Sequence, residues 1–331
     1  MAQVTGTATV WNSPNYDGLL WTADVTPNSG TGTPFLTLVG GINGQNARRV
    51  SDFDFAMSSE YDFPAAAQPA ITETASLTAP SAVSPVLSQA RNTCQIYQES
   101  VDVSYKKIST TERIATDIVQ GGVGYWAKDG ENNQSNIVNR NKMYSLQKIA
   151  RDASYTFLNG VFQLSTSSAV AAKTGGVIPA ITTSAVAAGG AALSKALMQE
   201  LFKNVVENSG GQSFNSRPVI FVNAFQKQKI SDIYGYQPDD WTVGGISIQT
   251  ILTDFGRVGV VYDSMIPPAT LLLAAMGVIR PVFCDVPGKG NMFFEELAKT
   301  GAADKAQIYG QMGIDFANEK MHGKITGLAI A

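Results

Sequence analysis

The chain has 331 residues, of which 44% are apolar and only 15% charged, and its formal net charge is −3. Tight electrostatic binding of nucleic acid requires an excess of cationic side chains, so this composition excludes it. The apolar content is enough for a large core, and the length predicts two compact units. So little charge over so much surface favours a chain that is largely covered by copies of itself.

The cysteines and the hydropathy pattern bear on location. Cys94 and Cys284 are far apart in the sequence and show no metal-ligand spacing, which indicates two buried thiols in a cytoplasmic assembly. The sequence opens on no positively charged apolar leader and contains no run of 18 apolar residues. We therefore expect neither secretion nor a membrane span.

The first 46 residues are rich in turn-forming residues and low in charge. A few large apolar side chains are scattered among them, and isolated apolar residues in irregular chain cannot build a core of their own. We interpret this segment as an arm that docks on another surface. Its expected anchors are Leu19, Trp21, Phe35 and Leu36.

Residues 52–104 combine two strand patterns with a long irregular middle. Phe53, Phe55 and Met57 alternate with smaller or polar residues, and Val101 and Val103 alternate again near the end. About 30 residues between them have no helical period and carry several prolines. The pattern predicts a long two-stranded hairpin that projects from the body.

The stretch from Ser135 to Gly160 predicts one long helix. Its apolar residues recur at spacings of three and four and so form one stripe. Asn159 and Gly160 are residue types that tolerate the left-handed conformation closing a helix. A shorter helix is expected over Ile108–Gln120. The residues of the stripe are Met143, Leu146, Ala150, Ala153 and Phe157.

The hairpin and the helix carry opposite charge. Residues 52–104 contain seven acids and one base, Arg91, whereas the helix has four bases and one acid, Asp152. The two surfaces are complementary and in an oligomer can meet between neighbours; the alternative is ordinary solvated charge. The hypothesis places the hairpin acids Asp54, Glu60, Asp62 and Glu73 near Arg140, Lys142, Lys148 or Arg151 of a neighbour.

The second half of the chain alternates helices and strands. Residues 165–190 are low in complexity and predict a linker or exposed loop. A strong amphipathic helix then ends at Gly210, and strand, helix and strand in that order imply an α/β unit. The predicted elements are a strand at 218–222, a helix at 224–234, strands at 246–252, 258–262 and 269–274, and a strand-rich return over 292–297, 307–316 and 323–330, with a bulge in the second of these.

Motifs for chemistry are weak throughout the sequence. His322 has no partner cysteine or acid at fixed spacing, and no nucleophile-elbow sequence exists to pair with it, so we interpret it as structural. The triplet Asp254 to Gly256 copies a kinase magnesium motif but lacks the other kinase motifs. We expect no catalytic residue, no cofactor and no metal.

The order of these segments resembles the HK97-type fold of tailed-phage major capsid proteins. Four stretches are similar to the SU10-like capsid subfamily and carry the resemblance from about residue 33 to the end. They are Thr33 to Leu36, Gln95 to Ser104, Phe255 to Asp263, and Lys324 to Gly327.

The resemblance implies an α+β fold with named parts. These are an N-terminal arm at residues 1–51, an extended hairpin loop at 52–106, a peripheral domain with its spine helix at 107–174, an α/β axial domain at 175–284, and a return to the peripheral domain at 285–331. It also implies self-assembly as hexamers and pentamers into an icosahedral shell around double-stranded DNA, in a virion assembled in the host cytoplasm.

Two departures from the family pattern are informative. Members that cross-link their shells use a lysine on the extended loop, and residues 52–104 contain none, so we expect a non-covalent shell. The hairpin begins soon after the start of the sequence, so scaffolding is expected from a separate protein or not at all. Further expected partners are a portal and a decoration protein. No contact with a membrane is expected.

Contact with packaged DNA is expected to be loose and non-specific. Candidate lining residues are Arg48, Arg49, Lys106 and Lys107. Three other interpretations remain open from sequence: an encapsulin-like nanocompartment shell with an enzyme cargo, a β-rich adhesin or tail-fibre component, and an α/β hydrolase-like enzyme. The second requires a repeat and the third a nucleophile–base pair, and we find neither in the sequence.

Overall fold

The computed structural model describes residues 32–41, 47–62, 66–79, 84–107, 132–235, 239–243 and 246–330. The predicted arm anchors Leu19 and Trp21 and the predicted helix at 108–120 lie outside these ranges. For Glu60, Asp62 and Arg140 the backbone is described and the side chain is not.

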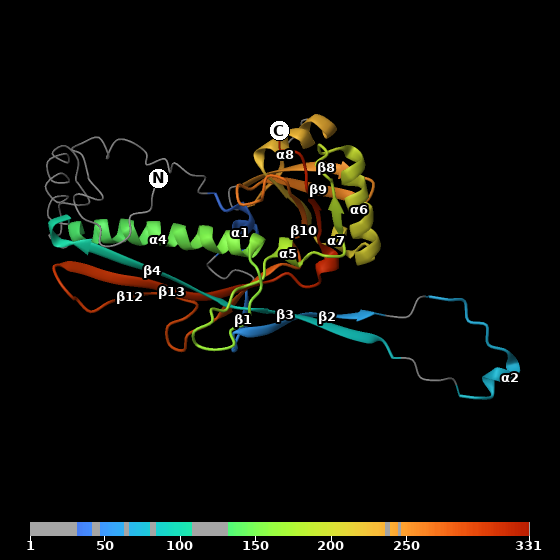
Figure 1. The fold of residues 1–331 in the computed structure, drawn as a ribbon, viewed down its shortest axis with the longest axis horizontal. Helices are drawn as coiled ribbons and strands as arrows, with labels where there is room; N and C mark the ends of the chain where they lie inside the picture. Colours follow the sequence, from blue (N-terminus) through green and yellow to red (C-terminus); the bar gives the residue numbers. More distant parts are fainter. Residues whose placement is uncertain are drawn as a thin grey trace.

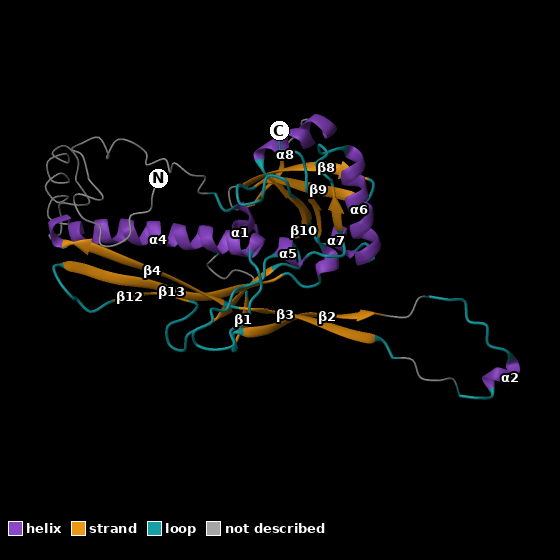
Figure 2. Ribbon diagram, viewed as in Figure 1, coloured by secondary structure: helices purple, strands orange, loops and turns teal. Residues whose placement is uncertain are grey.

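The described chain forms two adjoining bodies and one long projection (Figure 1). In the first body, helix α4 (Asn132–Asn159) lies along a five-stranded sheet. The second body is a seven-stranded sheet with helices packed on it, as the colouring of Figure 2 shows. The projection is a hairpin of β2 (Asp54–Asp62) and β3 (Val86–Thr93), with the short helix α2 (Glu73–Ser76) at its far end.

The five-stranded sheet is built around β13 (Ala303–Asp315). On one side β13 pairs antiparallel with β4 (Gln95–Ser104), and on the other with β12 (Met292–Glu296) and β11 (Arg280–Cys284). Strand β1 (Arg48–Val50) adds in parallel to β11. Segments from the start, middle and end of the chain thus meet in one sheet.

The bulge predicted in β13 is wrong. Its pairing with β4 runs without a register shift from Ala303 to Met312. The inward positions alternate as expected, but one of them is Gly310, which leaves a gap in the hydrophobic pattern. A Cβ at Gly310 would lie 3.0 Å from the Cε atom of Met292, so the neighbouring side chain fills the space.

Helix α4 confirms the predicted long helix and begins three residues earlier than predicted. Ile149, Ala153, Phe157 and Leu158 are buried on the side that faces the sheet. Gly160 follows the last helical residue, and its N–H donates to the Thr156 carbonyl at 2.8 Å. Of the predicted stripe, Ala153 and Phe157 are buried and Leu146 and Ala150 pack partly buried against the same cluster, whereas Ile149 and Leu158 were not predicted.

The seven-stranded sheet contains the predicted α/β unit. The parallel pair β6 (Pro218–Val222) and β9 (Gly256–Tyr262) lies at its centre, and α8 (Ala224–Tyr234) follows β6. Helix α6 (Lys195–Ser209) begins at Ser194, whose side chain accepts from the Leu197 N–H, and ends at Gly210 with φ 60°. The remaining strands and helix are β5 (Ala185–Ala187), β14 (Gly323–Thr326), β10 (Leu271–Ala275), β8 (Ile246–Thr253), β7 (Asp239–Val243) and α7 (Gln212–Asn215).

Two hydrophobic clusters cover the two faces of this sheet. On one face, α6 packs Met198, Leu201 and Phe202 with Ile220 of β6. On the other face, Phe221 joins a cluster that also contains residues of the five-stranded sheet. All residues of β6 and β10 are therefore buried, and the two bodies share one core.

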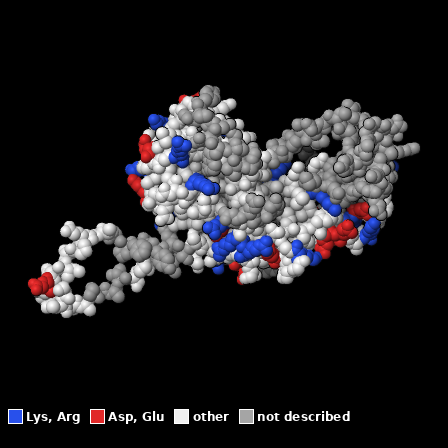
Figure 3. Space-filling view, turned by 180° about the vertical axis from the view of Figure 1, so that it is seen from behind, with Lys and Arg blue, Asp and Glu red and all other residues white. Residues whose placement is uncertain are grey.

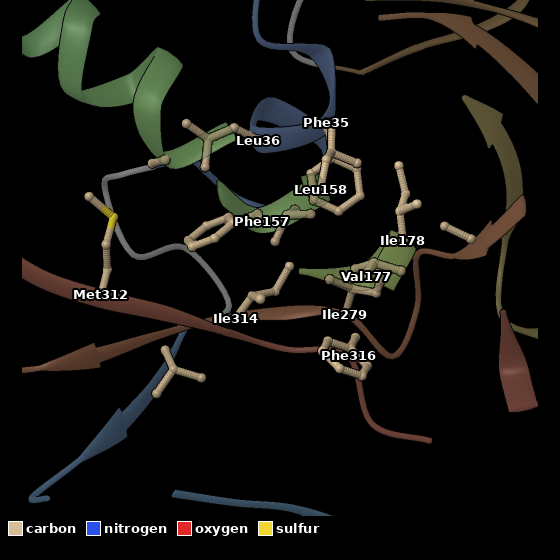
Figure 4. Close-up of a cluster of buried hydrophobic side chains, with 14 of the residues drawn as sticks. Phe35, Leu36, Phe157, Leu158, Val177, Ile178, Ile279, Met312, Ile314 and Phe316 are labelled. Carbon is tan, nitrogen blue, oxygen red and sulfur yellow. The ribbon is translucent and has the colours of Figure 1, made fainter. Parts of the chain in front are cut away.

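The shared core corrects two of the predicted arm anchors. Phe35 and Leu36 lie in α1 (Pro34–Val39) and are buried against Phe157, Leu158 and neighbouring side chains of the same chain (Figure 4). Phe35 also packs edge-on against Phe221, with ring centroids 5.2 Å apart. Both residues are used inside their own subunit, so we no longer assign them to a contact between subunits.

The predicted linker or exposed loop at 165–190 is correct for residues 165–173, which are largely exposed, and wrong for the rest. It contains α5 (Val177–Ala180) and β5, and it buries Val177, Ile178, Ile181 and Val186 in the core. Strand β4, which the resemblance placed in the extended loop, belongs to the five-stranded sheet. Strand β14, placed in the return to the peripheral domain, belongs to the seven-stranded sheet.

Candidate assembly surfaces

The hairpin is the most exposed element of the described chain. Strands β2 and β3 pair antiparallel, with a register shift between Ala56 and Ser59, and carry the tip away from both bodies (Figure 1). Thr72 caps α2, its Oγ1 accepting from the Ala75 N–H at 3.2 Å. At the tip Ile71 is 69% and Leu77 84% exposed. Large apolar side chains at the end of a projection form a surface for a partner.

The acid at the tip is Glu73, in the first turn of α2. Figure 3 shows acidic atoms at the far end of the projection, surrounded by uncharged surface. Asp54 lies at the other end of the hairpin and is exposed. The structure thus places two of the predicted acids, Asp54 and Glu73, where another subunit can reach them.

The base of the hairpin is fixed by the buried side chain of Asn92, at the end of β3. Its Nδ2 donates to the carbonyls of Gly175 at 3.0 Å and Ile314 at 2.9 Å. Its Oδ1 accepts from the N–H groups of Thr93 and Gly175, both at 2.9 Å. Thr174 adds a hydroxyl bond to the Thr93 carbonyl at 2.8 Å. Because all three hydrogen-bonding positions of the Asn92 amide, its two N–H groups and its oxygen, are used, this buried network rigidifies the direction of the hairpin.

Arg48 ties β2, the first strand of the hairpin, to the five-stranded sheet. Its Nη1 donates to the Ala56 carbonyl at 2.7 Å and to the Asp315 carboxylate at 2.9 Å. Asp315 also accepts from the Ala317 N–H at 3.0 Å, in a turn where Ala317 has φ 57°. Sequence reasoning missed Asn92 and Asp315, since neither belongs to a periodic pattern or a motif.

The structure places the four predicted DNA-lining residues in different environments. Lys107 is 3% exposed and cannot present its charge to DNA. Arg49 forms an ion pair with Asp285 at 2.8 Å, and Arg48 is engaged as described above. Lys106 is exposed. We therefore withdraw Lys107 from the set, whereas Arg48, Arg49 and Lys106 stay untested predictions; the Arg49 side chain is 74% exposed.

The basic residues of α4 face their own subunit more than the sequence suggested. Lys148 forms an ion pair with Glu99 of β4, and the Lys142 ammonium lies 3.7 Å from the ring centroid of Phe294. Asp102, also counted among the hairpin acids, lies 3.7 Å from Lys305. Glu99 and Asp102 belong to the sheet rather than the projection, because the hairpin proper ends at Thr93. Part of the predicted charge complementarity is thus satisfied within one chain.

Besides pairing with Glu99 of β4, Lys148 affects the pKa of a carboxylate on its own helix, Asp152. Burial raises the pKa of Asp152, Lys148 lowers it, and Glu99 raises it again. We expect Lys148→Met to destabilise the subunit by about 1 kcal/mol and Glu99→Gln by about half as much. The first change leaves the charges of Glu99 and Asp152 to repel each other, whereas the second leaves the attraction between Lys148 and Asp152.

Urea unfolding of both variants and of the double variant measures this difference. The control is Lys203→Met, which removes an exposed pair with Glu207 within α6 and is expected to cost about 0.3 kcal/mol. Equal losses for Lys148→Met and Glu99→Gln would contradict the assignment.

The end of the chain is fastened by two buried or partly buried groups. His322 is fully buried; its Nδ1 accepts from the Ala275 N–H at 3.2 Å and its Nε2 donates to the Phe316 carbonyl at 2.8 Å. Glu319, in the 3₁₀ turn η1 (Glu319–Met321), accepts from the N–H groups of Thr182 at 2.6 Å and Thr183 at 3.2 Å. Burial raises the pKa of Glu319, and these bonds outweigh it and lower that pKa overall. Both ring nitrogens of His322 thus form hydrogen bonds with backbone groups, as expected of a structural histidine.

Among the described residues, no helix has both the length and the apolar character needed to cross a bilayer. Within those residues we also find no group of three His, Cys, Asp or Glu side chains arranged to hold a metal ion.

Comparison with solved structures shows the fold. The chain is similar to the capsid subunit of cyanophage A-1(L), with 13% identity and a TM-score of 0.58 over 92% of this chain and 96% of that one. It is also similar to the capsid of a native GTA particle (11% identity, TM-score 0.51, 98% and 100% covered). A third similar structure is from Mycobacterium phage Patience (10% identity, TM-score 0.50, 86% and 83% covered). No curated protein matches the sequence.

The family follows from the sequence comparison. The model of the SU10 major capsid protein family matches residues 3–329, nearly the whole chain. The fold agrees: a long helix on a sheet, a projecting hairpin and a second α/β body are the parts of an HK97-type capsid subunit, as in the solved structures above. The chain therefore belongs to the SU10 major capsid protein family.

Proposed function

We propose that this major capsid protein assembles as hexamers and pentamers into an icosahedral shell around the double-stranded DNA of a bacteriophage. Membership of the family makes the protein a capsid component of the virion that assembles into a multimeric shell. The proposal adds the capsomer types, the DNA content and assembly in the host cytoplasm. The role is structural rather than enzymatic.

The observation that supports this proposal is the hairpin. It holds Ile71 and Leu77 at the end of a projection, where they are exposed and far from the two bodies. The pairing of β2 with β3 keeps it extended, and the hydrogen bonds of Asn92 hold its base on the body. A head-to-tail contact between such subunits closes into rings, which is what hexamers and pentamers require. The absence of lysine from residues 52–104 supports a shell without covalent cross-links through this segment.

The proposed partners other than the chain itself are a portal and a separate scaffolding or decoration protein. Contact with DNA is proposed to be loose, because the protein has a net charge of −3 and three of the four candidate cations are engaged or buried. Acid–base contacts between neighbours remain part of the proposal for Asp54 and Glu73 with the exposed side of α4.

Negative-stain electron microscopy of the expressed protein tests shell formation directly. Closed icosahedral particles are expected, and particles isolated from phage-producing cells should contain DNA. A matched variant joins Asp62 to Val86 through an Asn-Gly turn, which retains β2 and β3 and removes the tip. It should fold, because residues 66–79 are exposed, but should fail to form closed shells. A compact wild-type monomer at high concentration, or particles filled with protein cargo, would overturn the proposal.

A further inference from the structure

A polar hollow lies in the seven-stranded body, beside helix α8. This helix begins directly after β6, and Val222 at the end of β6 pairs with Tyr262 at the end of the parallel strand β9. The hollow opens next to these carboxyl ends, between α8 and the strands β8 and β9 (Figure 1). In α/β sheets ligands commonly bind at the carboxyl ends of parallel strands, so the fold favours a site at this position.

The size of the hollow suits a small molecule. Its volume is about 460 Å³, within the range of about 300–1,000 Å³ that small-molecule sites occupy. Most such sites are largely apolar, whereas here the apolar lining consists of Ala224 and the ring of Tyr262. We call it the α8 hollow; its polar lining residues are Lys227, Gln228, Ser231, Asp232, Gln249 and Tyr262.

Four of these side chains have no partner in the part of the chain that the structure describes. Lys227 and Gln228 come from α8, Gln249 comes from β8 and Tyr262 from β9. None of the four forms a side-chain hydrogen bond or ion pair with another described residue. An ammonium group, two amides and a phenol together offer several donors and acceptors to one ligand.

The charge around the α8 hollow is balanced. Lys227 lines the hollow together with Asp232, and Asp232 also lies 3.8 Å from Lys229 on the same helix. A second acid, Asp263, is buried directly after Tyr262. Two cations thus stand against two acids, and a phosphate or carboxylate ligand gains little electrostatic attraction at this place.

A neutral ligand rich in hydroxyl groups fits this chemistry. Hydroxyl groups both donate and accept, so they can bond to amides, to a carboxylate and to an ammonium group. Tyr262 is 45% exposed, and the negative face of its ring attracts the hydrogens on the C–H side of a sugar ring. A nucleobase fits less well, because the described lining offers it one aromatic face and no second apolar wall.

We propose that the α8 hollow binds a neutral saccharide and is open in the assembled shell. A sugar ring lies on the ring of Tyr262, and its hydroxyl groups bond to Gln228 and Gln249. All of these residues belong to one chain, so each subunit carries a complete site. The inference goes beyond the proposed function, because it gives the shell an affinity for glycans in addition to its enclosing role.

Saturation-transfer difference NMR on purified shells tests the site. The probes are maltotriose and triacetylchitotriose as neutral saccharides, with adenosine monophosphate as an anionic nucleotide. We expect signal from the ring protons of at least one trisaccharide, with a dissociation constant of about 1 mM, and none from the nucleotide. Signal from the nucleotide alone, or from no probe, would overturn the saccharide site.

Variants locate the binding. Gln228→Leu removes an exposed amide of α8, so it should fold normally and weaken binding about fivefold. Tyr262→Ala should abolish the signal. The matched control is Tyr155→Ala, at a tyrosine of α4 that is 56% exposed, and it should bind as the wild type does. Unchanged binding in both Gln228→Leu and Tyr262→Ala would overturn the assignment to this hollow.

Spectra of unassembled subunits separate this inference from the shell function. Binding by shells and subunits alike supports the site. Binding by subunits but not by shells would mean that a neighbouring copy covers the hollow, and it would overturn a site open in the shell while the shell function stands. If no shells form, the shell function fails, and the subunit spectra alone support or overturn saccharide binding.

Discussion

Replacing Gly176 by alanine is expected to destabilise the subunit by about 3 kcal/mol. The backbone at Gly176 is ordinary extended chain, with φ −86° and ψ 166°, so any residue can adopt it. The obstacle is contact: an added Cβ would lie 2.6 Å from the Gly160 nitrogen and 2.8 Å from the Leu158 carbonyl. These are backbone atoms at the end of α4 and cannot rotate away. The clash also separates the Gly176 N–H from the Gly160 carbonyl, now at 2.8 Å.

Urea unfolding of unassembled subunits measures this loss, with Gly301→Ala as the control. A Cβ at Gly301 meets no atom within 4 Å, so that variant should match the wild type or gain about 0.5 kcal/mol. Because Gly176 adjoins the network around Asn92, Gly176→Ala should also reduce shell yield. A loss below about 1 kcal/mol would show that the close approach of the two segments is not required.

The close approach of Gly176 to the end of α4 illustrates why part of the fold could not be predicted from the sequence. Helix α4, β6 and α8 were predictable because periodicity and flanking turn residues act over a few residues. Residues 165–190 are small and polar, and composition alone predicts exposure. Residues 174–178 are nevertheless buried, because Gly176 lets its backbone meet the end of α4, which is a tertiary property without a local signal.

The same distinction applies to the candidate assembly surfaces. The projecting hairpin was predictable, because so many residues without a hydrophobic pattern have nothing of their own to pack on. The sequence did not predict whether a side chain packs on its own subunit or on a neighbour. Phe35 and Leu36 were expected to contact a neighbour but are buried in the core of their own subunit. Glu99 was assigned to the hairpin, yet pairs with Lys148, because charge counting cannot locate the end of a strand.

Acid is expected to weaken the subunit through His322. Burial lowers the pKa of its imidazole to about 4; the bond to the Phe316 carbonyl and the nearby Glu319 oppose this shift. The ring is neutral in the folded protein at neutral pH, with Nδ1 accepting from the Ala275 N–H. Protonation would place a second donor against that N–H, between the end of β10 and the chain after β13.

The direction of the effect follows from proton binding. An unfolded histidine has a pKa of about 6.5, so between pH 6.5 and pH 4 the unfolded state binds more protons than the folded one, and stability falls as the pH falls. The loss accumulated by pH 4 is about 3 kcal/mol. It is absent above about pH 7.

His322→Gln separates this histidine from the carboxylates, which also titrate in acid. The variant should be less stable at neutral pH, because glutamine cannot satisfy both Ala275 and Phe316 with the same geometry. The difference in free energy of unfolding between wild type and variant should then shrink by about 3 kcal/mol between pH 7 and pH 4, since the lost group no longer takes up a proton on unfolding. Glu319, whose pKa is lowered, is present in both proteins and cancels in the comparison. A constant difference across this range would mean that His322 does not become charged when the subunit unfolds in acid, and would remove the acid sensitivity assigned to this junction.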